Sequence, residues 1–144
     1  MTTKVRITMT EYQARHVMYA MNLYSRVLMG QFDEIKHLFF GFGEEGKLYH
    51  RDEKHWHDYF DIYLEAIKRH VYPELHPNAY WGITGFTERN KCPPQATLVF
   101  DIYKMMDYKI SWYKDPKGGL TVNFDKPMHF FDKCPLPEVE VFEE

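Results

Sequence analysis

The sequence is poor in cysteine, with two among 144 residues, and it has no long hydrophobic run. Cys92 and Cys134 are each followed directly by proline, and neither belongs to a CxxC pair or to a His/Cys pair at zinc-ligand spacing. No stretch approaches the roughly 18 apolar residues of a membrane span, and the opening MTTKVRITMT lacks the apolar core of a signal peptide. These absences predict a reduced, cytoplasmic protein.

The charge is also small, at −3, with both signs interspersed and no long block of one sign. Such a chain neither coats nucleic acid nor imitates its charge, so extended nucleic acid is not an expected partner, and neither is a membrane. Aromatic residues, in contrast, make up 17% of the chain. An aromatic excess is typical of a heavy core, of a protein interface, or of a site that stacks flat ligands.

The spacing of apolar and small residues predicts a long helix over residues 10–39, the longest in the chain and the centre of its core. Thr10 followed by Gln13 forms a capping-box pattern that sets the start of this helix. The residues at alternating steps of four and three are Ala14, Met18, Met21, Ser25, Leu28, Phe32, Ile35 and Phe39.

Two further helices are predicted, over residues 52–71 and 95–113. The first has Asp52 as N-cap and a stripe expected to be buried, formed by Trp56, Phe60, Tyr63, Ile67 and Val71. Alternating apolar residues predict short strands at 4–9, 80–86, 120–124 and 139–141. We therefore expect an α+β fold in which three main helices pack with a small, mostly antiparallel sheet.

The length suits a single domain, residues 1–144, whose prolines extend a C-terminal tail over 132–144. The helix at 95–113 is apolar around much of its circumference, which indicates burial on two sides. If one side faces the sheet and the other a second subunit, the protein is a homo-oligomer.

A polar stripe on the first helix is the first candidate site. It contains Gly30, which costs roughly 1 kcal/mol against alanine inside a helix and so indicates a kink or a close approach. In one interpretation Tyr19, Asn22 and Arg26 line a groove beside Gly30 that receives an anionic or planar partner. In the other, the stripe is a solvated face with an Arg26–Asp33 contact, or the helix breaks at residues 29–31.

The proline-rich stretch at 72–94 is the second candidate, because long connections are often binding elements. Trp81 and Arg89 would contact a ligand there; alternatively, Trp81 closes the end of the helical layer. The glycine-containing stretch 40–47 is not a phosphate loop, because it follows a helix and carries two glutamates.

The helix at 52–71 carries the chain's densest set of potential metal ligands. His57 and Asp61 are four residues apart, with Glu65 one turn further. However, the HExxH pattern is absent, and alternating acids and bases favour a salt-bridged exposed face. His50, His55 and His70 lie nearby in the sequence. We predict no bound metal and no cofactor, with a metal-dependent phosphoester hydrolase as the alternative.

Two segments, LYSRVLMGQFDEI at 23–35 and FDIYKMMDYKISWYKDPKGGLTVNFDKPM at 100–128, together with PLPEVE at 135–140, resemble a recurrent group of proteins. The group consists of small accessory proteins encoded by tailed phages and prophages of Gram-positive and gut bacteria. The resemblance implies a phage protein acting in the host cytoplasm and supplies no catalytic residue. Proteins of this kind often inhibit CRISPR nucleases or sequester the cyclic nucleotide signals of bacterial immunity.

The resulting hypothesis is a non-catalytic protein that inhibits a host anti-phage defence system. It would bind a host immune protein, or sequester a nucleotide signal through Tyr19, Asn22, Arg26, Trp81 and Arg89. Aromatic platforms and arginine forks suit a nucleotide, and aromatic anchors suit a protein interface. A minor phage structural protein is a further alternative.

Overall fold

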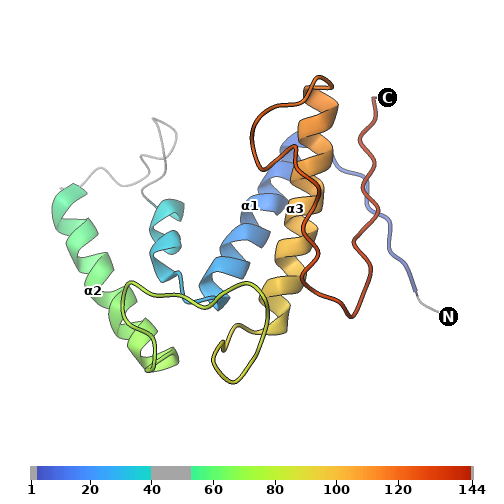
Figure 1. Cartoon of the computed structure of the whole chain (residues 1–144). Helices are drawn as coiled ribbons and strands as arrows, with labels where there is room; N and C mark the ends of the chain where they lie inside the picture. Colours follow the sequence, from blue (N-terminus) through green and yellow to red (C-terminus); the bar gives the residue numbers. More distant parts are fainter. Residues whose placement is uncertain (1–2, 40–52, 144) are drawn as a thin grey trace.

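A computed structural model describes residues 3–39 and 53–143, except for the side chains of residues 53–57. In these residues the chain forms α1 (Glu11–Leu28), the 3₁₀ helix η1 (Phe32–Leu38), α2 (Glu53–Val71) and α3 (Pro94–Lys114). Figure 1 shows α1 and α3 side by side, with α2 set apart from them. No strand occurs in the described ranges, so the predicted α+β fold with a sheet is wrong.

The start of α1 is as the sequence predicts. The backbone N–H of Gln13 donates to Oγ1 of Thr10 at 3.2 Å, and the Thr10 N–H donates to Oε1 of Gln13 at 2.9 Å. This reciprocal pair satisfies two backbone donors that a helix N-terminus leaves open. The capping box is therefore confirmed.

The end of α1 differs from the prediction, because the helix stops at Leu28 and does not reach residue 39. Gly30 has a φ of 94°, its N–H donates to the carbonyl of Val27, and the Gln31 N–H donates to the carbonyl of Arg26. This pairing is a Schellman motif, in which a left-handed glycine closes the helix and satisfies its last carbonyls. The open alternative of a break at residues 29–31 is thus the correct one, and α3 is the longest described helix.

The core lies between α1 and α3. Small residues allow a close crossing: Ser25 and Ala96 are fully buried, and the Ser25 hydroxyl donates to the Ala96 carbonyl at 3.0 Å. On one side of this crossing, Met29 packs with Cys92 and Ala96. On the other, Ile110 packs with Ala14 and Met18. The predicted core positions Ala14, Met18, Ser25 and Phe32 are buried, whereas Phe39 is exposed.

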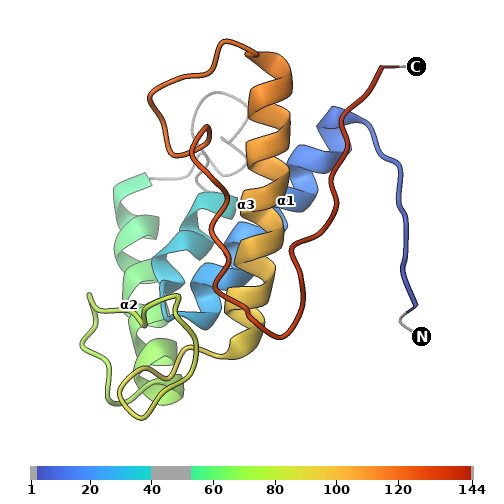
Figure 2. The same ribbon diagram turned by 45° about the vertical axis from the view of Figure 1, so that its right-hand side comes forward.

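The second side of α3 is covered by the chain itself. Buried Asp101 accepts hydrogen bonds from the backbone N–H groups of Phe130 and Phe131 at 2.8–3.1 Å, which fixes the following segment along α3 (Figure 2). Nearer the C-terminus of α3, Trp112 packs edge-on against Phe124. A second subunit is therefore not needed to bury this helix, although oligomerisation remains a prediction.

The four predicted strands are irregular segments. Residues 120–124 turn back on themselves, since the Phe124 N–H donates to the Thr121 carbonyl at 3.0 Å. Residues 80–86 form a loop, and the backbone N–H of Trp81 near its start donates to the carbonyl of Met29 at 2.7 Å. Residues 4–9 and 139–141 are extended, but no backbone hydrogen bond between described residues joins them to another segment. Alternation of apolar and polar residues indicates an extended chain. A β-strand also needs a neighbouring segment with which to form backbone hydrogen bonds, and these segments lack one among the described residues.

The buried stripe predicted for α2 is wrong at three of its positions, although Phe60 is half-buried against Phe39. Tyr63, Ile67 and Val71 are exposed, and the buried residues of the described side chains are Leu64 and Lys68. The reason is that, among the described helices, α2 packs mainly against η1. A short 3₁₀ helix covers only a narrow strip of α2, so much of its apolar surface stays open.

Several predictions fall outside the described residues. They are the Asp52 N-cap, the glycine-containing stretch 40–47, and the side chains of His50, His55, Trp56 and His57. Among the helices that the structure does describe, none is long and apolar enough to cross a membrane.

Candidate functional site

The predicted site residues of α1 separate into two environments. Tyr19 is 76% exposed, and with Asn22 it lines a small groove of about 190 Å³ between α1 and α3. Tyr103 and Asp107 form the α3 side of this groove, and burial raises the pKa of the Asp107 carboxyl. Arg26 does not line the groove. The structure therefore places Tyr19 and Asn22 together in the groove, whereas Arg26 contacts Asn22 from outside it.

Arg26 holds the end of α1 to η1. Its Nε donates to Oδ1 of Asn22 at 3.0 Å, and its Nη1 donates to Oε1 of Gln31 at 2.8 Å and of Glu34 at 3.1 Å. The acidic partner is thus Glu34 and not the predicted Asp33. Because these contacts span the Schellman turn, Arg26 stabilises the junction between the two helices.

Gly30 is closely approached by side chains of the segment that follows α2. A Cβ placed on it would lie 2.9 Å from Cδ1 of Leu75 and 3.6 Å from Cδ2 of Tyr72. The Tyr72 hydroxyl also donates to the carbonyl of Leu28 at 2.6 Å. Close approach of another segment to this glycine is confirmed. Gly30 also lines a cavity, described below, but Tyr19, Asn22 and Arg26 do not line that cavity.

Trp81 and Arg89 lie in different parts of the 72–93 connection. Trp81 packs against the cluster of Met29, Cys92 and Ala96, and its indole Nε1 is buried without a hydrogen-bond partner among the described residues. This supports the alternative in which Trp81 closes the end of the helical layer. Arg89 is exposed in the turn formed by residues 87–90.

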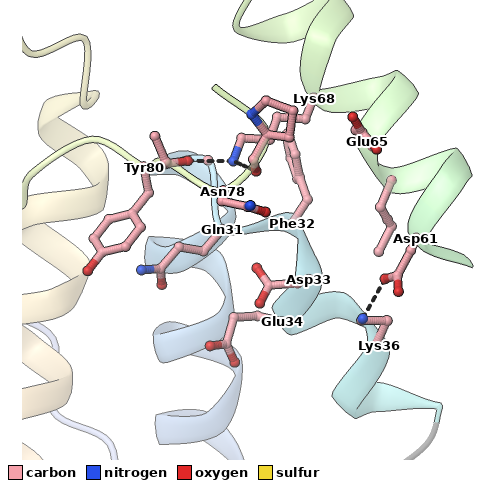
Figure 3. Close-up of a pocket in the computed structure, with 14 residues that line it drawn as sticks. Gln31, Phe32, Asp33, Glu34, Lys36, Asp61, Glu65, Lys68, Asn78 and Tyr80 are labelled. Atoms are coloured by element: carbon pink, nitrogen blue, oxygen red, sulfur yellow. Dashed lines mark hydrogen bonds and ion pairs between the residues drawn. The ribbon is translucent and has the colours of Figure 1, made fainter. Parts of the chain in front are cut away.

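The largest cavity described lies elsewhere, between η1, α2 and the 77–80 loop (Figure 3). Its volume of about 510 Å³ falls in the range of small-ligand sites. Four carboxylates line it, Asp33 and Glu34 from η1 and Asp61 and Glu65 from α2. The cations on its wall are Lys36 and Lys68, so its lining is net acidic.

Most of these carboxylates already have partners. Lys36 bridges η1 to α2 through Asp61, and Arg69 pairs with Glu65 one turn away on α2. Glu34 pairs with Arg26. Asp33 makes no ion pair with another described residue, and Figure 3 shows it on the η1 wall, apart from the Lys36–Asp61 pair. Asp33 is therefore the carboxylate available to an incoming cation.

Lys68 closes one end of the cavity. The residue is 6% exposed, and its ammonium donates to the carbonyls of Pro77 and Ala79, which tie the loop to α2. Burial lowers the pKa of this ammonium, and the charge of Asp33 offsets part of that effect. Lys68 is thus a buried cation held by two carbonyls, and it shapes the cavity wall. The charge of Asp33 acts on Lys68 without an ion pair between them, so Asp33 can still pair with another positive charge.

On the side opposite the cavity, α2 presents an apolar surface to solvent. We call it the outer face of α2; it consists of Ile62, Tyr63, Ala66, Ile67 and His70, all exposed. Steps of one, three and four residues place these side chains on one side of a helix, away from Leu64 and Lys68. Arg69, which pairs with Glu65 at the cavity wall, lies between this wall and the outer face along the helix surface.

The potential metal ligands of α2, which belong to the alternative interpretation, do not form a described site. Asp61 is engaged by Lys36 and Glu65 by Arg69, while the side chain of His57 is outside the described residues. Within the part of the chain that the structure describes, no group of three or more His, Cys, Asp or Glu side chains is placed to hold a metal ion. The salt-bridged face, the other interpretation of this helix, accounts for both described acids.

Sequence reasoning missed the cavity and the outer face of α2. One signal was present, because apolar residues occur all around α2, and two apolar sides on one helix imply two contacts. The position of η1 could not be predicted from the sequence, because it depends on the direction in which the chain leaves the helix break at Gly30.

Comparison with known proteins found no family model, no curated protein and no solved structure that matches this chain.

Proposed function

We propose that this chain is a non-catalytic, phage-encoded binding protein that inhibits a host anti-phage defence system by docking onto a host protein. The phage context comes from the resemblance of residues 23–35 and 100–128 to accessory phage proteins. The observation that carries the binding role is the exposed outer face of α2. Ile62 and Tyr63 there are 61% and 64% exposed.

An apolar helix face of this kind suits a protein partner. Amphipathic helices bind by laying anchors at steps of three and four residues into an apolar groove. Large side chains at such positions commonly supply most of the binding energy, with smaller residues around them excluding water. On α2 the anchors are Ile62, Tyr63 and Ile67, with Ala66 between them.

The acidic cavity specifies the charge of that partner. It opens on the same helix, and Asp33 in its wall has no described ion-pair partner. Because the cavity and the outer face lie on opposite sides of α2, a partner that contacts both must surround the helix. Such a partner has an apolar groove for the outer face and, beyond the rim of that groove, a lysine or arginine that enters the cavity to meet Asp33. Immune proteins that handle nucleic acid carry basic surfaces of this type.

The other target of the hypothesis, a nucleotide signal, has less support. Phosphates need several positive groups converging on one place. The large cavity is lined by four carboxylates, and Nε and Nη1 of Arg26 are occupied within the chain. For the hydrolase and the structural protein, no observation on the described residues argues in favour.

The test is phage plating on bacterial strains that each carry one defence system and express this protein. We expect the wild type to restore plating on a strain whose defence restricts the phage. The double variant Ile62→Asp/Ile67→Asp should lose this effect by at least tenfold, since two charges on the outer face prevent its burial.

Val122→Asp is the matched control, because Val122 is 63% exposed but lies in the segment after α3. It should restore plating as the wild type does. Failure of the wild type on every defence system would overturn the anti-defence role. Equal restoration by the double variant would overturn the assignment of binding to the outer face of α2.

A further inference from the structure

The two ends of the described chain carry matching alternating patterns of opposite charge. Residues 4–7 read KVRI, and residues 138–141 read EVEV. In an extended chain, alternation places Lys4 and Arg6 on one side and Val5 and Ile7 on the other. The same applies to Glu138 and Glu140 against Val139 and Val141. Each segment is thus a strand sequence whose charges complement those of the other.

Within one copy the two segments approach each other but do not pair. Nζ of Lys4 lies 3.8 Å from Oε1 of Glu138, and both side chains are more than four-fifths exposed. Met9 and Val141 pack against the same core cluster, so the segments run in the same direction along one edge of the molecule (Figures 1 and 2). No backbone hydrogen bond between described residues links them.

The apolar side of the N-terminal segment is left open by this arrangement. Val5 is 81% exposed and Ile7 is 70% exposed, although both alternate in phase with Met9, which packs on the core. Two parallel strands without further neighbours are only weakly stable in water. In a single copy, therefore, the backbone groups of these segments stay unpaired and Val5 and Ile7 stay exposed.

We propose that two copies of this chain exchange these segments, so that the basic strand 4–9 of each pairs antiparallel with the acidic strand 138–142 of the other. The contact occurs twice about a two-fold axis and is therefore closed, as isologous dimers require. Strand addition supplies main-chain hydrogen bonds to both edges. The inference does not depend on the proposed docking role of α2.

One antiparallel register satisfies both sides of the ribbon. It sets Ile7 opposite Val139, Val5 opposite Val141, and Arg6 opposite Glu140. Cross-strand pairs of β-branched residues and of opposite charges each contribute about 0.2–1 kcal/mol. Met9 then faces Pro137, where the missing N–H of proline ends the ladder.

A second copy fits better than another partner because each chain carries both complementary halves. When the segments are exchanged, the exposed ion pair between Lys4 and Glu138 within each copy is broken, and exposed ion pairs contribute little to stability. In return, the exposed apolar pair Val5 and Ile7 becomes covered. The Thr10 capping box fixes the point at which the exchanged strand leaves α1.

The test uses two charge-reversed proteins, Lys4→Glu/Arg6→Glu and Glu138→Lys/Glu140→Lys, with mass measured by light scattering after size exclusion. The wild type should have twice the monomer mass. Each variant alone should be a monomer, because its two segments carry the same charge. An equimolar mixture should regain the doubled mass, since each variant then complements the other at both contacts. A protein with all four replacements should dimerise as the wild type does.

A monomeric wild type at every concentration would overturn the proposal. Variants that remain dimeric alone would also overturn it and would move the self-contact to another surface, such as the outer face of α2. If the wild type dimerises but the mixture of variants stays monomeric, the segments are not exchanged between copies. Circular dichroism of each variant provides the folding control, because all four side chains are exposed.

Discussion

Gly30 and Leu75 approach so closely that a Cβ on the glycine would lie 2.9 Å from Cδ1 of the leucine. Gly30 also has a φ of 94°, which side-chain-bearing residues rarely adopt. This one position ends α1 and receives the segment that follows α2. The placement of α2, and hence of the acidic cavity and the outer face, depends on it.

Gly30→Ala should therefore lower the free energy of unfolding by about 3 kcal/mol, through backbone strain and displacement of Leu75. Urea denaturation measures the change. Gly82→Ala is the matched control, because the nearest atom to its Cβ is 3.6 Å away and its φ is not in the left-handed region. A Gly30 variant as stable as the Gly82 variant would show that the helix junction tolerates a side chain.

Asp101→Ala should cost about 3 kcal/mol, because it leaves the backbone N–H groups of Phe130 and Phe131 without their charged acceptor. Hydrogen exchange should show faster exchange at these two amides. Asp132→Ala, at an exposed position, should change stability by less than about 0.5 kcal/mol. Unchanged exchange at residues 130 and 131 would mean that Asp101 does not hold this segment.

Arg26→Ala should destabilise the protein by about 1–2 kcal/mol, because Asn22, Gln31 and Glu34 lose a shared donor. Thermal melting measures this. Arg26→Lys should restore only part of the loss, since an ammonium cannot reproduce the planar fork of the guanidinium. A fully stable Arg26→Ala variant would argue against a structural role and return Arg26 to the candidate ligand site.

Asp107 should give stability an unusual pH dependence. Burial raises the pKa of its carboxyl above the ordinary 3.8, so the folded state favours the neutral form. Stability therefore falls as the pH rises from the ordinary pKa of an aspartate through the raised pKa of Asp107 in the folded protein. Above this raised pKa the full loss of stability is present. Asp107→Asn should be more stable than the wild type at neutral pH, with the gain shrinking as acid protonates the wild-type carboxyl.

Melting temperatures across this pH range check the sign, with the exposed Asp125→Asn as control. An Asp107→Asn variant that is less stable at neutral pH would show that the attraction of Lys104 outweighs burial.

Local signals predicted the helices well and their environment poorly. The Thr10–Gln13 capping box and Pro94 at the start of α3 act within one helical turn, so the sequence alone was sufficient. Gly30 signalled a break or a close approach, and both occur; the segment that approaches it could not be identified, because Leu75 is distant in the sequence. The strands at 4–9 and 139–141 were predicted from alternation, which describes a segment but not its neighbour.

The candidate site shows the same limit. Exposure of Tyr19 on α1 followed from the helical period. The groove predicted around Arg26 failed, because the side chains that occupy its surroundings come from η1 and from the segment after α2. Tyr63 and Ile67 of the outer face of α2 were predicted to be buried, because periodicity identifies an apolar side of a helix but not whether anything covers it.

The most direct test of the account compares Ile62→Asp and Tyr19→Ala in binding to the host protein whose defence system is inhibited. Both side chains are exposed, so neither change should alter the melting temperature by more than a few degrees. The account predicts that Ile62→Asp weakens binding at least tenfold in calorimetry while Tyr19→Ala binds as the wild type does. Loss of binding by Tyr19→Ala with Ile62→Asp unaffected would place the site on α1 and contradict the account.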